Sequence, residues 1–167
     1  MDATRLRATQ APLKDRYRTD PASARIPTSA TGDYRDADVT ATVDGFAGAV
    51  RAGLHAAAGG DGTDACSADL LLQALLGCAG VTLRAVATAM GVEVRGADLR
   101  ADGWWDARGT LGVDRSAPVG VQDVVVTITV DTDAAEEDLA RLARATERYC
   151  VVGQSLATPP AIRVVRG

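Results

Sequence analysis

The stretch SADLLLQALLGCAGVTLRAVATAM, residues 67–90, decides how this chain folds. Ser67 is a suitable N-cap residue, and Asp69 adds a negative charge to the first turn, where exposed N–H groups and the helix dipole favour it. Gly91 follows the last apolar residue, and glycine is the residue type that most often ends a helix in the left-handed conformation. The pattern therefore predicts a helix that begins at Ser67, runs to Met90 and ends at Gly91.

Nearly every face of this predicted helix is apolar. A helix of that kind lies inside a domain or in a membrane. We favour the buried interpretation, because the segment is barely long enough to span a bilayer and carries Gln73, Thr82 and the charged Arg84. The small residues Gly77 and Gly80 would allow another element to approach closely, for example the same helix of a second subunit.

Strand-like segments flank the helix on both sides. Before it, three short stretches separated by glycine and aspartate are expected to form antiparallel strands: 24–30, 39–43 and 46–54. After it, residues 92–95 alternate between apolar and polar until the phase slips at Gly96, which predicts a β-bulge in a strand that continues to Ala101. A hairpin is predicted over 104–119. One face of the next strand is formed by apolar residues at alternate positions: Val124, Val126, Ile128 and Val130.

A second, amphipathic helix is predicted after this strand. Asp133 and Glu136 have the spacing of a capping box, and Glu137 and Arg141 form an i, i+4 pair on the solvated side. The residues predicted to face the core recur at helical spacing: Leu139, Leu142, Thr146 and Tyr149. A final strand is expected at 161–165, so the order of elements indicates an α+β fold with antiparallel or mixed sheets around the central helix.

The chain of 167 residues has the length of one domain. Residues 1–24 are polar, rich in arginine and interrupted by proline, so we expect them to be an N-terminal extension with one helical turn at 13–17. The remaining residues, 25–167, are expected to form a single domain. With 47% hydrophobic and 24% charged residues, the whole chain has the composition of an ordinary globular protein.

The charge of the chain argues against two classes of partner. Eighteen aspartates and four glutamates outnumber seventeen arginines and one lysine, which gives a formal net charge of −4. Nucleic acids and anionic membranes are bound by concentrated basic surfaces, so neither is expected as a partner. No apolar run follows the first basic residues, so we expect no secretory signal and a cytoplasmic location.

Three cysteines, Cys66, Cys78 and Cys150, are too few for a disulfide framework in a reducing compartment. They are either buried small hydrophobic residues or reactive thiols, and for Cys66 we expect a semi-buried thiol. His55 is the one histidine of the sequence and has no cysteine near it along the chain, so we expect a surface residue and no structural zinc. The residues after Cys150 could restart as a short helix, and a thiol at a helix N-terminus has its thiolate favoured.

The segments around Cys78 and Cys150 resemble the OsmC/Ohr family of thiol-dependent peroxidases. The resemblance rests on residues 67–78, SADLLLQALLGC, and on the later stretch 147–152, ERYCVV, with Leu156. In that family one cysteine lies inside a long central helix, and the second begins a turn after the other helix. The order of predicted elements from about residue 25 to residue 165 agrees with this pattern, so the resemblance implies an OsmC-like fold.

The resemblance also implies a chemistry. Cys78 would be the peroxidatic thiol and Cys150 the resolving thiol. A Cys78 thiolate would attack an organic hydroperoxide and become a sulfenic acid, and Cys150 would condense with it to a disulfide. An external dithiol reductant would restore both thiols, with no bound cofactor and no metal, and the family fold implies a homodimer.

The family supports its thiolate with an arginine from the N-terminal strands, held by a glutamate near the start of the central helix. The arginines in the corresponding part of this chain are Arg25, Arg35 and Arg51. Ala68 stands at the position of the glutamate, and Val151 replaces the proline that follows the second cysteine. The sequence therefore leaves the group that stabilises the thiolate unassigned.

A second hypothesis belongs to another functional class. The chain would then be a non-catalytic OsmC-like protein that binds a small hydrophobic ligand, or a redox-regulated interaction protein. Ala68 and the many small residues favour it. Under this hypothesis the cysteines merely pack, so the positions of the two sulfurs distinguish it from the first, because a disulfide needs close Cα atoms.

Overall fold

The computed structural model describes residues 2–46 and 48–167. The chain forms two compact units. We call them the helix unit, which comprises the chain through Pro27, Leu75–Ala101 and Val125–Gly167, and the hairpin unit, which comprises Thr28–Ala74 and Asp102–Val124. Helix α2 (Ser67–Met90) and strands β5 (Gly96–Trp104) and β6 (Gln122–Asp131) contribute residues to both.

Helix α2 confirms the predicted central helix from its first residue to its last. Its end is closed by Gly91, which has a left-handed φ of 70°. The N–H of Gly91 donates to the carbonyl of Thr88, and the N–H of Val92 donates to the carbonyl of Ala87. These two bonds are the Schellman arrangement, which satisfies the last carbonyls of a helix and explains why α2 stops there.

The buried surface of α2 is one stripe with four-residue spacing: Leu75, Ala79, Leu83 and Ala87. Gly80 allows β5 to approach the helix, because an added Cβ would lie 3.0 Å from Leu99 Cδ2. Other positions are more exposed within the single chain, up to 73% for Val81. Among the described residues, α2 is the one helix whose length and apolar composition would suit a membrane span.

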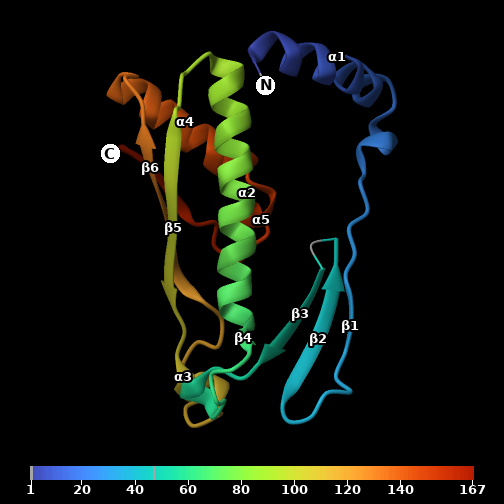
Figure 1. Ribbon diagram of the computed structural model, residues 1–167, viewed down its shortest axis with the longest axis vertical. Helices are drawn as coiled ribbons and strands as arrows, with labels where there is room; N and C mark the ends of the chain where they lie inside the picture. The colour runs from blue at the N-terminus through green and yellow to red at the C-terminus, as the bar shows by residue number, and fades with distance from the viewer. Residues whose placement is uncertain (1, 47) are drawn as a thin grey trace. The chain divides into compact units, whose positions relative to one another are not determined.

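The sheet that contains β6 has the strand order β5-β6-β7, with β7 at Ala161–Arg166. Strands β6 and β7 run parallel, with Val126 opposite Ile162. Helix α4 (Glu136–Tyr149) and the one-turn helix α5 (Val151–Gln154) connect them, as Figure 1 shows. The predicted apolar face of β6 is confirmed for Val126, Ile128 and Val130, which have no exposed surface, whereas Val124 is half-buried.

Helix α4 packs against β7 and confirms most of the predicted apolar face. Leu139, Leu142 and Thr146 are buried, whereas Tyr149, which was also predicted for this face, is 65% exposed. The predicted capping box is wrong, since Ala135 is the N-cap residue and makes no side-chain hydrogen bond. Arg141 pairs with Asp138 at 3.0 Å instead of with Glu137.

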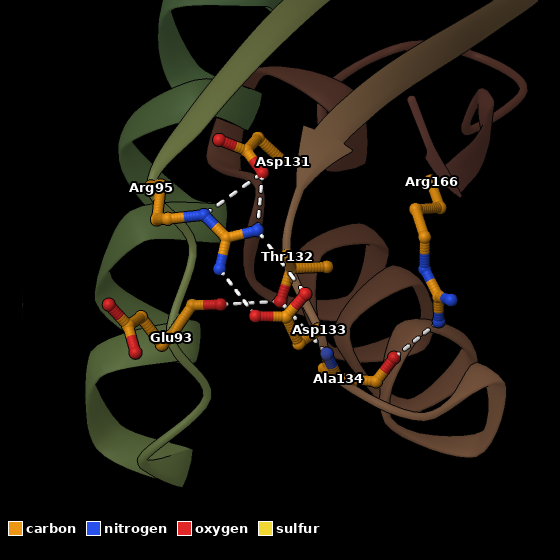
Figure 2. Close-up of polar contacts among 7 residues, drawn as sticks. All are labelled: Glu93, Arg95, Asp131, Thr132, Asp133, Ala134 and Arg166. Atoms are coloured by element: carbon orange, nitrogen blue, oxygen red, sulfur yellow. Dashed lines mark hydrogen bonds and ion pairs between the residues drawn. The ribbon is translucent and has the colours of Figure 1, made fainter.

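Asp133, the predicted cap of α4, instead joins a network centred on Arg95 (Figure 2). Arg95 donates to Asp131 Oδ1 from Nε and Nη2, at 3.0 and 2.5 Å, and to Asp133 Oδ2 from Nη1, at 2.6 Å. These hydrogen bonds lower the pKa of both carboxyls. The hydroxyl of Thr132 donates to the carbonyl of Glu93. The network therefore ties the loop after α2 to the end of β6.

This network also accounts for a wrong strand prediction. Residues 92–95 lie outside the sheet, and β5 begins at Gly96, so the phase slip marks the start of the strand and not a β-bulge. The backbone N–H of Arg95 donates to the carbonyl of Asp131 at 2.9 Å. The alternation of residues 92–95 thus reflects a loop held by Arg95 and Thr132.

The hairpin unit contains a sheet with the order β1-β2-β3-β4, formed by Thr31–Asp33, Thr40–Gly45, Gly48–Gly53 and Ala65–Cys66. Strands β1, β2 and β3 are antiparallel, and β4 runs parallel to β3. None of the described residues in these four strands is buried. The sheet therefore lacks a hydrophobic core of its own.

Two predictions in the hairpin unit and before it need correction. The stretch 24–30 is not a strand, because a 3₁₀ helix at Pro21–Ala24 precedes an extended segment without ladder bonds. The predicted hairpin over 104–119 instead contains the short helix α3 (Ala107–Thr110), which is capped by Asp106. Part of the predicted strand 46–54 is present as β3, and residue 47 lies outside the described residues.

The N-terminal segment holds a full helix, α1 (Ala3–Thr19), and not a single helical turn. Asp2 is its N-cap and accepts a hydrogen bond from the N–H of Arg5 at 2.8 Å. Pro12 lies inside α1, so proline did not interrupt the helix as we expected. No described residue of α1 is buried, and the division between an extension and a domain at residue 25 stays a prediction.

The buried face of α4 provides a test of the fold. Leu142→Ala is expected to lower the free energy of unfolding by about 2–5 kcal/mol, because Leu142 has no exposed surface and truncation leaves a cavity. Val113→Ala is the control, since Val113 is 75% exposed and should change stability by less than about 0.5 kcal/mol. Urea unfolding measures both, and equal effects would contradict the assigned core.

Candidate functional site

Two of the three cysteines meet in the helix unit. Cys78 lies on α2 and is half-buried, whereas Cys150 ends α4 and is completely buried. Both are free thiols, and the interaction between their side chains lowers the pKa of Cys78 and raises the pKa of Cys150. The structure therefore brings together the two sulfurs that the sequence analysis singled out.

Helix α5 supplies the hydrogen-bond donors around this pair. Cys150 is its N-cap, and the Cys150 sulfur accepts from the N–H of Gly153 at 3.4 Å. Hydrogen bonding by the backbone N–H groups of Val152 and Val151 lowers the pKa of Cys78. The short helix predicted after Cys150 is thus confirmed, and its first turn faces both sulfurs.

Gly153 is buried because the space beside it is taken. A Cβ at this position would lie 3.3 Å from the Cys150 sulfur and 3.5 Å from the ring of Pro160. A side chain there would displace the sulfur or the proline ring. The packing therefore fixes where the buried thiol sits.

The pKa values of the two thiols move in opposite directions. For Cys78, burial raises the pKa, but donors from Val152, Cys150, Thr82 and Val151 outweigh it, so the pKa lies below the usual value. For Cys150, burial is the main cause of a raised pKa, and the interaction with Cys78 raises it further. Cys78 is accordingly the thiol that ionises first, and the thiolate is the nucleophilic form.

The three candidate arginines do not appear among the main influences on Cys78. Arg51 on β3 pairs with Asp64 at 3.3 Å, and Arg35, after β1, pairs with Asp33 at 3.5 Å. Arg25 is exposed after the 3₁₀ helix. Within the described residues, uncharged donors surround the sulfur, and the role expected for an arginine stays untested.

Val151 differs from the proline usual at this position because it has a backbone N–H. The sequence comparison with the OsmC/Ohr pattern put valine where proline is usual, and proline has no N–H. Here the N–H of Val151 is one of the groups that lower the pKa of Cys78. The substitution thus adds a hydrogen-bond donor beside the sulfur.

The sequence analysis did not assign Thr82 to the site, although its hydroxyl also lowers the pKa of Cys78. Thr82 follows Cys78 by four residues on a predicted helix, so both side chains lie on one face. The i, i+4 spacing could have indicated that Thr82 lies beside Cys78. By itself, however, a threonine in an apolar helix is ordinarily a packing residue.

The other predicted residues, Cys66, His55 and Ala68, belong to the hairpin unit. Cys66 is half-buried in β4, as expected. His55 is exposed, its Nδ1 accepts from the N–H of Ala57 at 3.0 Å, and its ring meets the edge of Trp105. Ala68 lies in the first turn of α2, where it offers no polar side chain.

The family model that matches this chain, and solved structures that match it, belong to OsmC-like proteins. The profile of the OsmC-like protein family matches residues 60–165. No curated protein sequence matches the chain.

Several solved structures share the fold. An organic hydroperoxide resistance protein from Elizabethkingia anophelis, with thiocyanate bound, has a TM-score of 0.66 and 12% identity over 86% of this chain and 97% of that chain. An OsmC-like protein of unknown function from Vibrio cholerae has a TM-score of 0.67 and 13% identity over 84% of this chain and 100% of that one. The organic hydroperoxide resistance protein OhrB of Bacillus subtilis has a TM-score of 0.53 and 17% identity, over 85% and 98% of the two chains. At such identities the likeness shows the fold alone.

Proposed function

We propose that this chain, which belongs to the OsmC-like protein family, is a thiol-dependent peroxidase that reduces organic hydroperoxides. The observation that carries the proposal is the interacting pair of Cys78 and Cys150, whose pKa values are displaced in opposite directions. Cys78, half-buried and with a lowered pKa, is suited to attack the hydroperoxide. Cys150, buried and with a raised pKa, is suited to form the disulfide afterwards. The names of the Elizabethkingia and Bacillus structures support organic hydroperoxides as substrates.

In the first step the Cys78 thiolate attacks the terminal oxygen of the hydroperoxide. A sulfur–oxygen bond forms as the oxygen–oxygen bond breaks, and the departing alkoxide takes a proton to become an alcohol. Cys78 is left as a sulfenic acid. The donors around the sulfur keep the thiolate populated before the attack, which is the state that this step requires.

In the second step Cys150 attacks the sulfur of the sulfenic acid. A disulfide forms, and the hydroxyl leaves with the proton of the Cys150 thiol as water. The raised pKa keeps Cys150 protonated until Cys78 has reacted. An external dithiol then reduces the disulfide by thiol–disulfide exchange, and we propose the reducing cytoplasm as the place where this happens.

The proposal predicts the product of a single turnover. One equivalent of an organic hydroperoxide added to the reduced protein should give a Cys78–Cys150 disulfide, located by peptide mapping. Cys78→Ser should abolish dithiol-dependent turnover, because the pKa of Cys78 is lowered whereas that of Cys150 is raised. Cys66→Ser is the matched control and should keep turnover within about twofold. Thiols that survive the hydroperoxide unchanged would refute the proposal.

A second candidate function rests on a groove beside α2. It has a volume of about 330 Å³ and is lined mainly by small and branched apolar residues, with one charged group: Gly80, Val81, Leu83, Arg84, Ala87, Val94, Ala97 and Leu99. A groove of this size and lining suits a small hydrophobic ligand. In that case Cys78 would oxidise slowly and without preference for organic hydroperoxides, so the single-turnover experiment separates the two functions.

We also propose that the protein acts as a homodimer. The sheet of the hairpin unit has no buried residue among those described, and α2 leaves Val81 73% exposed. The net charges of the two units support a second copy of the chain as the partner that covers these surfaces. The hairpin unit has eleven aspartates against four arginines, whereas in the helix unit fourteen basic residues face eleven acidic ones. An exposed apolar helix face and an uncovered sheet, together with the opposite net charges of the two units, favour association of two chains.

The homodimer has a direct test. Sedimentation should give twice the 17.2 kDa mass of one chain at micromolar concentration. Val81→Arg should shift the protein toward the monomer, because it places a charge on the exposed apolar face of α2. Val81→Ala keeps that face uncharged and should remain dimeric. A monomeric wild type would contradict the proposal.

A further inference from the structure

The exposed face of α4 carries a stripe of arginines. Arg141, Arg144 and Arg148 recur at the spacing of helical turns, and all three are exposed. They line an open groove of about 340 Å³ together with less polar residues: Met90, Ala145 and Tyr149. We call it the arginine groove, and every residue that lines it belongs to the helix unit. One compact unit therefore combines positive charge with apolar and aromatic surface.

The chain itself neutralises only part of the charge in the arginine groove. Arg141 pairs with Asp138 at 3.0 Å, but in the part of the chain that the structure describes neither Arg144 nor Arg148 has an ion-pair partner. The helix dipole favours Arg148, which lies in the last turn, but it does not account for Arg144. Because these two arginines are four residues apart on one helix, their charges repel each other. An anionic partner would relieve this repulsion.

The residue types in the arginine groove favour carboxylates that are presented by another protein. A guanidinium binds a carboxylate through two parallel N–H donors, and arginine clusters are a recurring means of recognising acidic segments. Tyrosine and arginine are also enriched among the residues that dominate the binding energy of protein interfaces. The formal net charge of the whole chain is −4, so a nucleic acid would be repelled by the surface around this local stripe.

The arginine groove lies next to the resolving thiol along the chain. Tyr149 precedes Cys150 and Val151 follows it, and both neighbours are exposed although Cys150 itself is buried. A partner in contact with Arg148 and Tyr149 therefore borders the turn from α4 to α5 that contains Cys150. The proposed reaction cycle requires an external dithiol to reach the disulfide at this turn. The anionic partner and the reductant are accordingly best explained as one molecule.

We propose that the arginine groove is the docking site for an acidic segment of a protein dithiol, which reduces the Cys78–Cys150 disulfide. The inference rests on the thiol chemistry proposed above, and it names the class of partner for the last step of that chemistry. Arg144 and Arg148 bind the carboxylates of the partner, and Tyr149 provides the aromatic contact beside them.

The reduction is an ordinary thiol–disulfide exchange. A thiolate of the partner attacks the Cys78 sulfur, which is more exposed than that of Cys150, and a new sulfur–sulfur bond forms as the Cys78–Cys150 bond breaks. The proton of the second partner thiol goes to Cys150. The second partner sulfur, now a thiolate, attacks the first and releases Cys78 as a thiolate. The partner is thereby oxidised to a disulfide, and both cysteines of this chain are reduced.

The test compares two reductants of the same disulfide. Diamide, a thiol oxidant, forms the Cys78–Cys150 disulfide in the full-length protein, so that no hydroperoxide is needed. The rate of its reduction is measured by alkylation and mass spectrometry, with either dithiothreitol or a synthetic Cys-x-x-Cys peptide flanked by glutamates, below saturation. The double variant Arg144→Gln with Arg148→Gln should slow reduction by the acidic peptide about fivefold, the effect of losing two exposed ion pairs. The rate with uncharged dithiothreitol should stay within about twofold.

Matched variants separate docking from a change in net charge. Arg5→Gln with Arg7→Gln removes two exposed arginines from α1 and should leave both rates unchanged. Arg144→Glu with Arg148→Glu should instead favour the same peptide flanked by lysines, because the charges of the two surfaces are then exchanged. High ionic strength should reduce the difference between the wild type and the glutamine variant. The dithiothreitol rate reports in each variant whether the disulfide itself is unchanged.

Equal rates of the wild type and the glutamine variant with the acidic peptide would overturn the inference. It would also be overturned if that variant changed only the sedimentation of the protein, because a second copy of the chain would then cover the groove. Loss of binding to a DNA duplex with an unchanged peptide rate would assign the groove to nucleic acid and overturn it as well.

The oxidant separates this inference from the proposed function. If hydroperoxides fail to form the disulfide while the disulfide formed by diamide still shows the predicted difference, the proposed function falls and the docking site stands. If hydroperoxides form the disulfide and the acidic peptide shows no preference for the wild type, the docking site falls alone. A protein in which diamide gives no Cys78–Cys150 disulfide would overturn both.

Discussion

A thiol that must ionise on an apolar helix needs hydrogen-bond donors in place of the water it loses. Burial alone would raise the pKa of Cys78, yet that pKa is lowered, because backbone N–H groups, a thiol and a hydroxyl converge on the sulfur. The ends of α4 and α5 and the glycine at position 153 place these donors near the sulfur. Helix α4 ends at Cys150 so that α5 can turn its first N–H groups toward the sulfurs, and Gly153 leaves the space that this turn needs.

The donors come from two elements far apart in the sequence, which explains what could be predicted. The composition of residues 67–90 and Gly91 predicted α2 correctly, and the alternation in β6 predicted its buried face, since both signals are local. Cys78 and Cys150 were singled out by resemblance and lie together. Thr82 and the amide of Val151 were not foreseen, because a backbone N–H has no signature in sequence and the role of a hydroxyl depends on its neighbours.

The wrong predictions in other parts of the chain also arise from contacts between residues far apart in the sequence. The capping box at Asp133 and the bulge at Gly96 are sound local interpretations that a tertiary contact overrides, because Arg95 draws Asp131 and Asp133 into its own network. These side chains are largely exposed, so the network fixes a loop more than it adds stability. The strands of the hairpin unit were hard to predict for a different reason. Its strands have weak alternation and no buried residue, which is consistent with a sheet whose cover comes from another chain.

The central claim is that Cys78 is the thiol that attacks a hydroperoxide. Trapping the sulfenic acid tests it most directly. In a Cys150→Ser variant the intermediate has no resolving thiol, so one equivalent of an organic hydroperoxide in the presence of dimedone should place one dimedone adduct on Cys78 and none on Cys66. An unmodified Cys78, or equal labelling of Cys66 and Cys78, would contradict the claim.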